Sequence, residues 1–132
     1  MQRETIAQAA GGPGGAAGMV PGVKAGGFIF LSAIRGTYPG RNQPMSDDTK
    51  EQARQAFENI KSVLEASGGS LQHVVKVVLY LHDLKYRTPF HEVWMQYFPE
   101  NPPARIAIRV ADANAQEGGN AHFALDVIAL AP

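Results

Sequence analysis

The residue best placed to do chemistry in this sequence is Arg105, at the junction between a rigid loop and a strand. Residues 98–104, just before it, contain three prolines, which end a helix because each lacks an N–H donor and has a fixed φ. After it, Ile106, Ile108 and Val110 alternate with other residues, which predicts a strand over residues 105–110. A guanidinium held there suits a carboxylate or a phosphate. An ion pair with a surface acid is the plain alternative.

Other residue types that often do chemistry carry weaker signals. Ser32 could act as a nucleophile only with a base beside it, and no G-x-S-x-G motif surrounds it, so we expect it to line a cleft or cap a strand. His73, His82 and His91 recur every nine residues, which fits neither a helix pair nor a strand face. Residues 12–17 fit the dinucleotide pattern, but no strand precedes them. We therefore expect no metal and no cofactor.

The composition limits the classes of protein to which the chain can belong. A length of 132 residues indicates one domain. Twelve basic and twelve acidic residues give zero net charge, so no bulk field attracts nucleic acid or an anionic membrane. The absence of cysteine excludes disulfides and thiol nucleophiles. No apolar run is long enough to span a bilayer, and the polar N-terminus lacks the features of a signal peptide, so the sequence predicts a cytoplasmic protein.

The clearest predicted element is a helix over Thr49–Ser67. Apolar residues recur at intervals of three and four within residues 53–64, which gives one apolar stripe. Thr49 and Gln52 have the spacing of a capping box at its start. A pair of glycines follows its end and can supply the left-handed stop.

Strands are predicted on both sides of this helix. Residues 20–24 and Phe28–Ser32 form two strands around a Gly-Gly turn, and the second has the appearance of a central strand buried on both faces. Residues 71–81 alternate with a period of two, which places Val75 on one apolar face together with Val77 and two leucines. A final strand is predicted over Ala121–Leu130.

The remaining elements complete an α+β arrangement. Thr88, with Pro89 at the first helical position, opens a second helix that runs to Phe98. Two helical stripes need one face of a sheet to cover, and no third helix is available for the other face. That face carries Val78 and Tyr80 and is expected to be buried in an oligomer. Residues 1–19, rich in glycine and alanine, are expected to form a flexible arm.

Taken together, these pieces resemble the Rid family of reactive-intermediate imine deaminases, also called the YjgF or L-PSP endoribonuclease family. The resemblance covers nearly the whole chain beyond Val20. It rests on the runs GFIFLS at 27–32, EQARQAFENIK at 51–61, VVKV at 74–77 and YFPENPPAR at 97–105. It implies a single chorismate-mutase-like domain with a mixed sheet, two helices on one face, and a homotrimer with sites between subunits.

The resemblance also assigns positions in the site. The family's substrate-binding arginine falls on Arg105, which implies a small carboxylic acid as ligand. The glutamate that handles water in the family's imine and enamine hydrolases falls on Ala124. A tyrosine usual in the family falls on Met19, and a small polar residue or cysteine falls on Ala107. The carboxylate anchor is therefore present while the usual acid is missing, and Ser32 is expected to line the cleft.

Several residues could replace that acid or add to the site. Asp126 lies two positions beyond Ala124 on the same strand face. His122 lies two positions before Ala124 on that face, and Glu117 lies in the loop before the strand. Arg35 could bring a second guanidinium to the cleft and bind a second carboxylate, or it could pair with a nearby acid. The sequence thus predicts a deaminase with an unusual water activator. A non-catalytic trimeric carboxylate binder is the alternative, and a ribonuclease fits the neutral charge less well.

Overall fold

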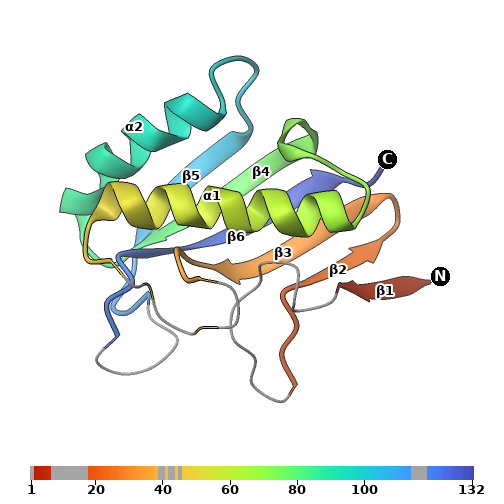
Figure 1. Cartoon of the computed structure of the whole chain (residues 1–132), viewed down its shortest axis with the longest axis horizontal. Helices are drawn as coiled ribbons and strands as arrows, with labels where there is room; N and C mark the ends of the chain where they lie inside the picture. Colours follow the sequence, from red (N-terminus) through yellow and green to blue (C-terminus); the bar gives the residue numbers. More distant parts are fainter. Residues whose placement is uncertain (1, 7–17, 39–40, 42–43, 45, 114–118) are drawn as a thin grey trace.

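The computed structural model describes residues 2–6, 18–38, 41, 44, 46–113 and 119–132. They form one six-stranded sheet in the order β1-β2-β3-β6-β4-β5, with two helices on one of its faces (Figure 1). All neighbouring strands are antiparallel except β4 and β5, which run parallel. The strands are β1 (Arg3–Ile6), β2 (Gly22–Ala25), β3 (Phe28–Ile34), β4 (Val74–Leu81), β5 (Ala104–Arg109) and β6 (Phe123–Leu130). The predicted α+β domain with a mixed sheet is confirmed.

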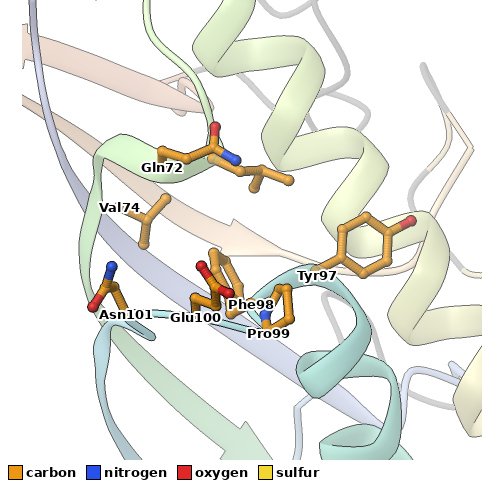
Figure 2. Close-up of a pocket in the computed structure, with 8 residues that line it drawn as sticks. Gln72, Val74, Tyr97, Phe98, Pro99, Glu100 and Asn101 are labelled. Carbon is orange, nitrogen blue, oxygen red and sulfur yellow. The ribbon is translucent and has the colours of Figure 1, made fainter.

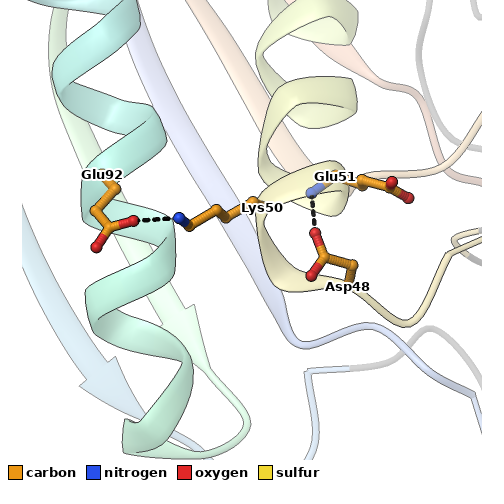
Figure 3. Close-up of polar contacts among 4 residues, drawn as sticks. All are labelled: Asp48, Lys50, Glu51 and Glu92. Carbon is orange, nitrogen blue, oxygen red and sulfur yellow. Dashed lines mark hydrogen bonds and ion pairs between the residues drawn. The ribbon is translucent and has the colours of Figure 1, made fainter.

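Helix α1 (Thr49–Ala66) forms where the apolar stripe predicted it, but its start differs from the prediction. Asp48 is the N-cap, and its carboxylate accepts a hydrogen bond of 3.0 Å from the backbone N–H of Glu51 (Figure 3). The predicted capping box of Thr49 and Gln52 is wrong, because both side chains bond to other parts of the chain. The helix ends at Ala66, one residue before the predicted end, and Gly68 supplies the predicted left-handed stop with a φ of 83°, which suits glycine.

Strand β4 departs from the strict alternation that the sequence predicted. A short 3₁₀ helix, Leu71–His73, precedes it, and the pairing with β6 shifts register between Val74 and Lys76. The irregularity buries Val74 with Val77 and leaves Val75 39% exposed. The prediction that Val75 lies on the buried face is therefore wrong, because a bulge changes which side chains point inward.

Helix α2 (Arg87–Tyr97) begins one residue earlier than the predicted cap at Thr88, after a short 3₁₀ helix, Leu84–Tyr86. Pro89 is thus the third helical residue, where its missing N–H still costs no intrahelical hydrogen bond. The two helices lie side by side across the sheet, and an exposed ion pair between Lys50 and Glu92 joins them (Figure 3). Their main contact is aromatic, with Phe57 of α1 touching four rings of α2 and its C-terminal end.

The two faces of the sheet have different surroundings. The helix side forms the core, with Leu79, Leu125 and Val127 fully buried. The other side is called here the open face, and no helix of the described part of the chain lies over it (Figure 1). Several apolar side chains on this face are exposed. Its exposed members include Phe28, Phe30, Ile106, Ile108 and Leu130. The expectation that Phe28–Ser32 is buried on both faces is therefore wrong for the single chain, although β3 is an interior strand.

The N-terminal region contains one element that the sequence did not indicate. Arg3–Ile6 pairs with β2 as the edge strand β1, and Ile6 is buried. Residues 7–17, the centre of the predicted flexible arm, lie outside the described residues. In the described part of the chain, neither helix has the length and apolar character required to cross a membrane.

Candidate functional site

Strand β5 and helix α2 together position the side chain of Arg105. In the parallel pairing of β4 and β5, Arg105 lies beside Val77, whose side chain is buried on the helix side of the sheet. The guanidinium of Arg105 therefore turns toward α2 and packs on two of its rings. Its central carbon is 4.6 Å from the ring centroid of Trp94 and 5.8 Å from that of Phe90. Contact with the aromatic faces stabilises the cation and fixes its plane.

The hydrogen bonding of Arg105 is incomplete. One terminal nitrogen, Nη2, donates to Nδ1 of His91 at 3.1 Å. The other, Nη1, is buried and has no hydrogen-bond partner among the described residues. Burial lowers the pKa of Arg105, and the nearby charge of Arg87 lowers it further. A desolvated guanidinium without an internal acid is suited to an anion that enters from outside.

A small cavity opens beside this guanidinium. It has a volume of about 220 Å³ and is lined by Arg87, Thr88, His91 and Arg105. All four can donate hydrogen bonds, although His91 accepts one from Arg105 here. Arg87 and His91 were not singled out as site residues from the sequence. The sequence feature that could have identified them is their four-residue spacing, which places both side chains on one face of a helix.

Asp126 lies in a second polar cluster, which we call the Asp126 cluster: Asp126, Tyr80, Ala33 and Arg35. The carboxylate of Asp126 accepts from the backbone N–H of Ala33 at 3.2 Å and from the hydroxyl of Tyr80 at 3.3 Å. The negative charge of Asp126 is the main reason that the pKa of Tyr80 is raised. Ala33 has a φ of 58°, an unfavourable value for a residue with a Cβ, at the irregularity between β3 and β6.

Arg35 belongs to the Asp126 cluster. Its Nε donates to the carbonyl of Ala113 at 2.7 Å, and its Nη1 donates to the carbonyl of Ala33 at 3.0 Å. Burial lowers the pKa of Arg35, while the charges of Asp112 and Asp126 oppose that shift. Arg35 does not line the cavity at Arg105. Within one chain, the structure therefore does not bring the two arginines together.

The other predicted site residues occupy separate places. Ala107 is half-buried against the core on the same side of β5 as Arg105. Ala124 is buried and pairs with Tyr80 on the open face, as Asp126 pairs with Val78. Arg105 and this pair of β6 residues thus lie on opposite faces of one sheet. The other two described positions, Ser32 and Met19, are exposed, and Glu117 lies outside the described residues.

His122 joins three segments just before β6. Its Nδ1 shares a hydrogen bond of 2.7 Å with the hydroxyl of Thr49, and its backbone N–H donates to the side chain of Gln52. Its ring stacks on Tyr86 with centroids 3.9 Å apart. Burial is the main cause of the lowered pKa of His122. These contacts indicate a structural role at the start of α1 rather than a role in water activation.

A further cavity lies at the other end of α2, where the chain turns into β5 (Figure 2). It has a volume of about 290 Å³, and its polar lining includes Gln72, Glu100 and Asn101. Tyr97 borders it, and its hydroxyl donates to Glu58 at 2.7 Å. Burial is the first cause that raises the pKa of Tyr97 to about 12. This cavity offers no cation for a carboxylate. No group of three metal-ligating side chains is found among the described residues.

Comparisons with known proteins agree with one another. A family model described as endoribonuclease L-PSP matches residues 12–130. Mitochondrial Mmf1 of Saccharomyces cerevisiae is 34% identical over 99 residues, which are 75% of this chain and 68% of the relative. The crystal structure of yeast Mmf1 covers 99% of this chain and 100% of its own, with a TM-score of 0.87 and 28% identity.

One further relative is named for a deaminase activity, and one further solved structure contains a bound amino acid. Chloroplastic Reactive Intermediate Deaminase A of Arabidopsis thaliana is 34% identical over 89 residues, 67% of this chain and 48% of the relative. The crystal structure of TdcF from Escherichia coli with bound serine has a TM-score of 0.80 and 25% identity, covering 96% of this chain and 98% of that one. Because two relatives are named for organelles, a cytoplasmic location does not follow from these similarities.

Proposed function

This chain belongs to the Rid family, whose members are related to endoribonuclease L-PSP, and on that premise we propose that it hydrolyses a small imine or enamine carboxylic acid. Arg105 binds the carboxylate of the substrate in this proposal. A family relative named as a reactive intermediate deaminase supports the reaction class. A relative with bound serine supports a small, amino-acid-like ligand.

The observation that carries the proposal is the incomplete bonding of Arg105. Its Nη1 is buried without a partner among the described residues, and a cavity of about 220 Å³ lies beside it. Leaving a buried donor unsatisfied is unfavourable, so a carboxylate that reaches it gains a strong charge-assisted hydrogen bond. The rings of Trp94 and Phe90 hold the guanidinium in place before the ligand arrives.

The proposed reaction needs little from the protein. An enamine first takes a proton at carbon and loses one from nitrogen, which gives the imine. Water then adds to the carbon of the C=N bond, and the nitrogen takes up a proton. The hydroxyl group of the resulting carbinolamine then loses its proton to form the C=O bond, the nitrogen gains a proton, and the C–N bond breaks, which releases ammonia and leaves a 2-oxo acid. Arg105 contributes by fixing the carboxylate, so that the neighbouring carbon stays in line with the attacking water.

We propose Asp126 as the group that accepts the proton of the water. Asp126 and Arg105 lie on opposite faces of the sheet in one chain. Their cooperation therefore requires two copies, which is consistent with a homotrimer whose sites lie between subunits. Glu117 is the second candidate for this role. The resemblance places the family's water-handling glutamate at position 124, where this chain has alanine. Another acid must therefore take the proton of the water in this proposal.

A non-catalytic binder of small carboxylates is the second candidate function. The specific observation in its favour is Ala124, because its methyl group cannot accept a proton from water. An endoribonuclease, the activity in the name of the family model, fits less well. The chain has zero net charge, so it lacks the positive field that draws a protein to nucleic acid.

The test compares Arg105→Ala with Arg109→Ala, an exposed arginine on the same strand. We expect the wild-type protein to accelerate hydrolysis of 2-iminobutyrate generated in a coupled assay. Arg105→Ala should lower kcat/KM about 10- to 100-fold, since one charge-assisted contact is lost. Arg109→Ala should leave it nearly unchanged.

Two other outcomes would change the conclusion. If the wild-type protein gives no acceleration but binds 2-oxobutanoate, and Arg105→Ala abolishes that binding, the chain is a carboxylate binder. If Arg105→Ala alters neither hydrolysis nor binding, Arg105 is not the anchor and the proposal is wrong.

A further inference from the structure

We propose that the cavity at Arg105 accepts a dicarboxylic substrate, whose second carboxylate is bound by Arg87. The inference rests on the proposed function, because it presumes that Arg105 binds the first carboxylate. It adds a residue that sets substrate specificity and names the class of substrate as a short imino or enamino acid with two carboxylates.

The cavity at Arg105 carries positive charge. Two of its four lining residues are arginines, and the other two are Thr88 and His91. The charge of Arg87 is near enough to Arg105 to lower its pKa, in addition to the larger effect of burial. Two like charges beside one small cavity repel each other until an anion lies between them. A dicarboxylate supplies one negative charge for each guanidinium.

Nearby acids do not neutralise this pair in the described part of the chain. Glu92, on the same helix, forms its ion pair with Lys50 of α1. Asp83, before the helix, accepts the backbone N–H of Lys85. No described acid forms an ion pair with Arg87 or Arg105. The positive charge of the cavity is therefore available to a ligand.

The position of each arginine indicates a division of roles. Arg105 is part-buried and held by two rings, so it presents a fixed fork to the first carboxylate. Arg87 is exposed at the first turn of α2, so its side chain can change conformation to meet the second carboxylate. A cavity of about 220 Å³ lies below the ~300–1,000 Å³ of drug-sized ligand sites, which favours a short molecule.

The test uses two stable 2-oxo acids with the same five-carbon chain. One is 2-oxopentanoate, with one carboxylate, and the other is 2-oxopentanedioate, with two. Binding of both is measured by calorimetry for the wild-type protein, Arg87→Gln and Lys85→Gln. Lys85 is an exposed cation two residues earlier, so its change removes the same charge without touching the cavity.

We expect the wild-type protein to bind the dicarboxylate about tenfold more tightly than the monocarboxylate. Arg87→Gln should abolish that preference and leave monocarboxylate affinity within about twofold. Lys85→Gln should keep the preference. Equal affinities in the wild-type protein, or a preference that survives in Arg87→Gln, would overturn the inference.

The experiment separates this inference from the function on which it rests. If Arg87→Gln has no selective effect while Arg105→Ala abolishes binding of both acids, only the second-carboxylate role fails. If Arg105→Ala leaves both affinities unchanged, the proposed function fails first. A change in molecular mass of Arg87→Gln, without any change in ligand preference, would show that Arg87 instead pairs with a neighbouring copy.

Discussion

Two residues of this chain, Arg105 and Ala33, lie in energetically unfavourable environments. Arg105 keeps a buried donor without a partner in the described structure, although the aromatic contacts partly offset its lost hydration. Ala33 holds a backbone angle that disfavours its Cβ, and Asp126 stabilises it by accepting its N–H. Strain and incomplete bonding often occur where a protein binds something. At this scale, the cavity at Arg105 and the Asp126 cluster are the places where ligands and partners are expected.

The first prediction at this scale concerns pH and His122. Its pKa is lowered in the folded chain, chiefly by burial. Above about pH 6.5 the free imidazole is neutral, so the folded and the unfolded chain bind the same number of protons at His122. In that range His122 adds no pH dependence to the free energy of unfolding. As the pH falls through that value, the unfolded chain binds a proton that the folded chain resists. The free energy of unfolding should therefore fall until the pH reaches the lowered pKa.

His122→Gln isolates this effect. The variant should lose about 1 kcal/mol at pH 7.5, because the contact with Thr49 is weakened, and its stability should depend less on pH between 7.5 and 5. Urea unfolding at several pH values measures both quantities. His73→Gln serves as the control, because His73 is not among the charges that act on His122. An unchanged pH slope in His122→Gln would contradict the prediction.

Both helices and five of the six strands were predictable from the sequence pattern, whereas β1 and the ends and irregularities of the other elements were not. The stripe of α1 and its glycine stop follow from local sequence. The cap was misassigned because Asp48 and Thr49 are adjacent polar residues, and only the fold shows that Thr49 bonds to His122. The bulge that exposes Val75 depends on pairing with β6, about fifty residues away. Such features are set by tertiary contacts that the local pattern does not contain.

A prediction at the element scale tests which residue caps α1. Asp48→Ala should lower the free energy of unfolding by about 1 kcal/mol, because the N–H of Glu51 loses its acceptor. Glu51→Ala keeps that N–H and should cost only a few tenths. Denaturant unfolding of both variants measures the difference. An equal loss in the two variants would show that general charge near the helix dipole, rather than the cap, stabilises this end.

The whole molecule has one covered face and one open face, which the sequence indicated by counting helices. It did not indicate that Arg105 turns to the helix side while Ala124 and Asp126 lie on the open side. That arrangement follows from strand order and the parallel pairing of β5, which alternation alone does not reveal. The place of Arg105 at the start of β5 was predictable, because prolines precede it and a strand follows. Its neighbour Arg87 became evident only once α2 was placed over β5.

The last prediction is that three copies of this chain associate through the open face. Phe28, Phe30 and Ile106 are each at least 40% exposed in the single chain, which is unfavourable for a contiguous apolar surface. Light scattering should give a mass about three times 14.2 kDa. Ile106→Asp should shift the mass to a single chain, since burying an unpaired carboxylate in the interface is costly.

Met95→Asp provides the matched control for this experiment. Met95 is 51% exposed and lies on α2, on the other side of the sheet, while Ile106 is 50% exposed. The same change in chemistry at equal exposure should leave the assembly intact in Met95→Asp, and circular dichroism should show folded protein in both variants. A monomeric wild-type protein, or dissociation of both variants alike, would rule out the open face as the interface. It would also remove the route by which Asp126 of one copy reaches a substrate held at Arg105 of another.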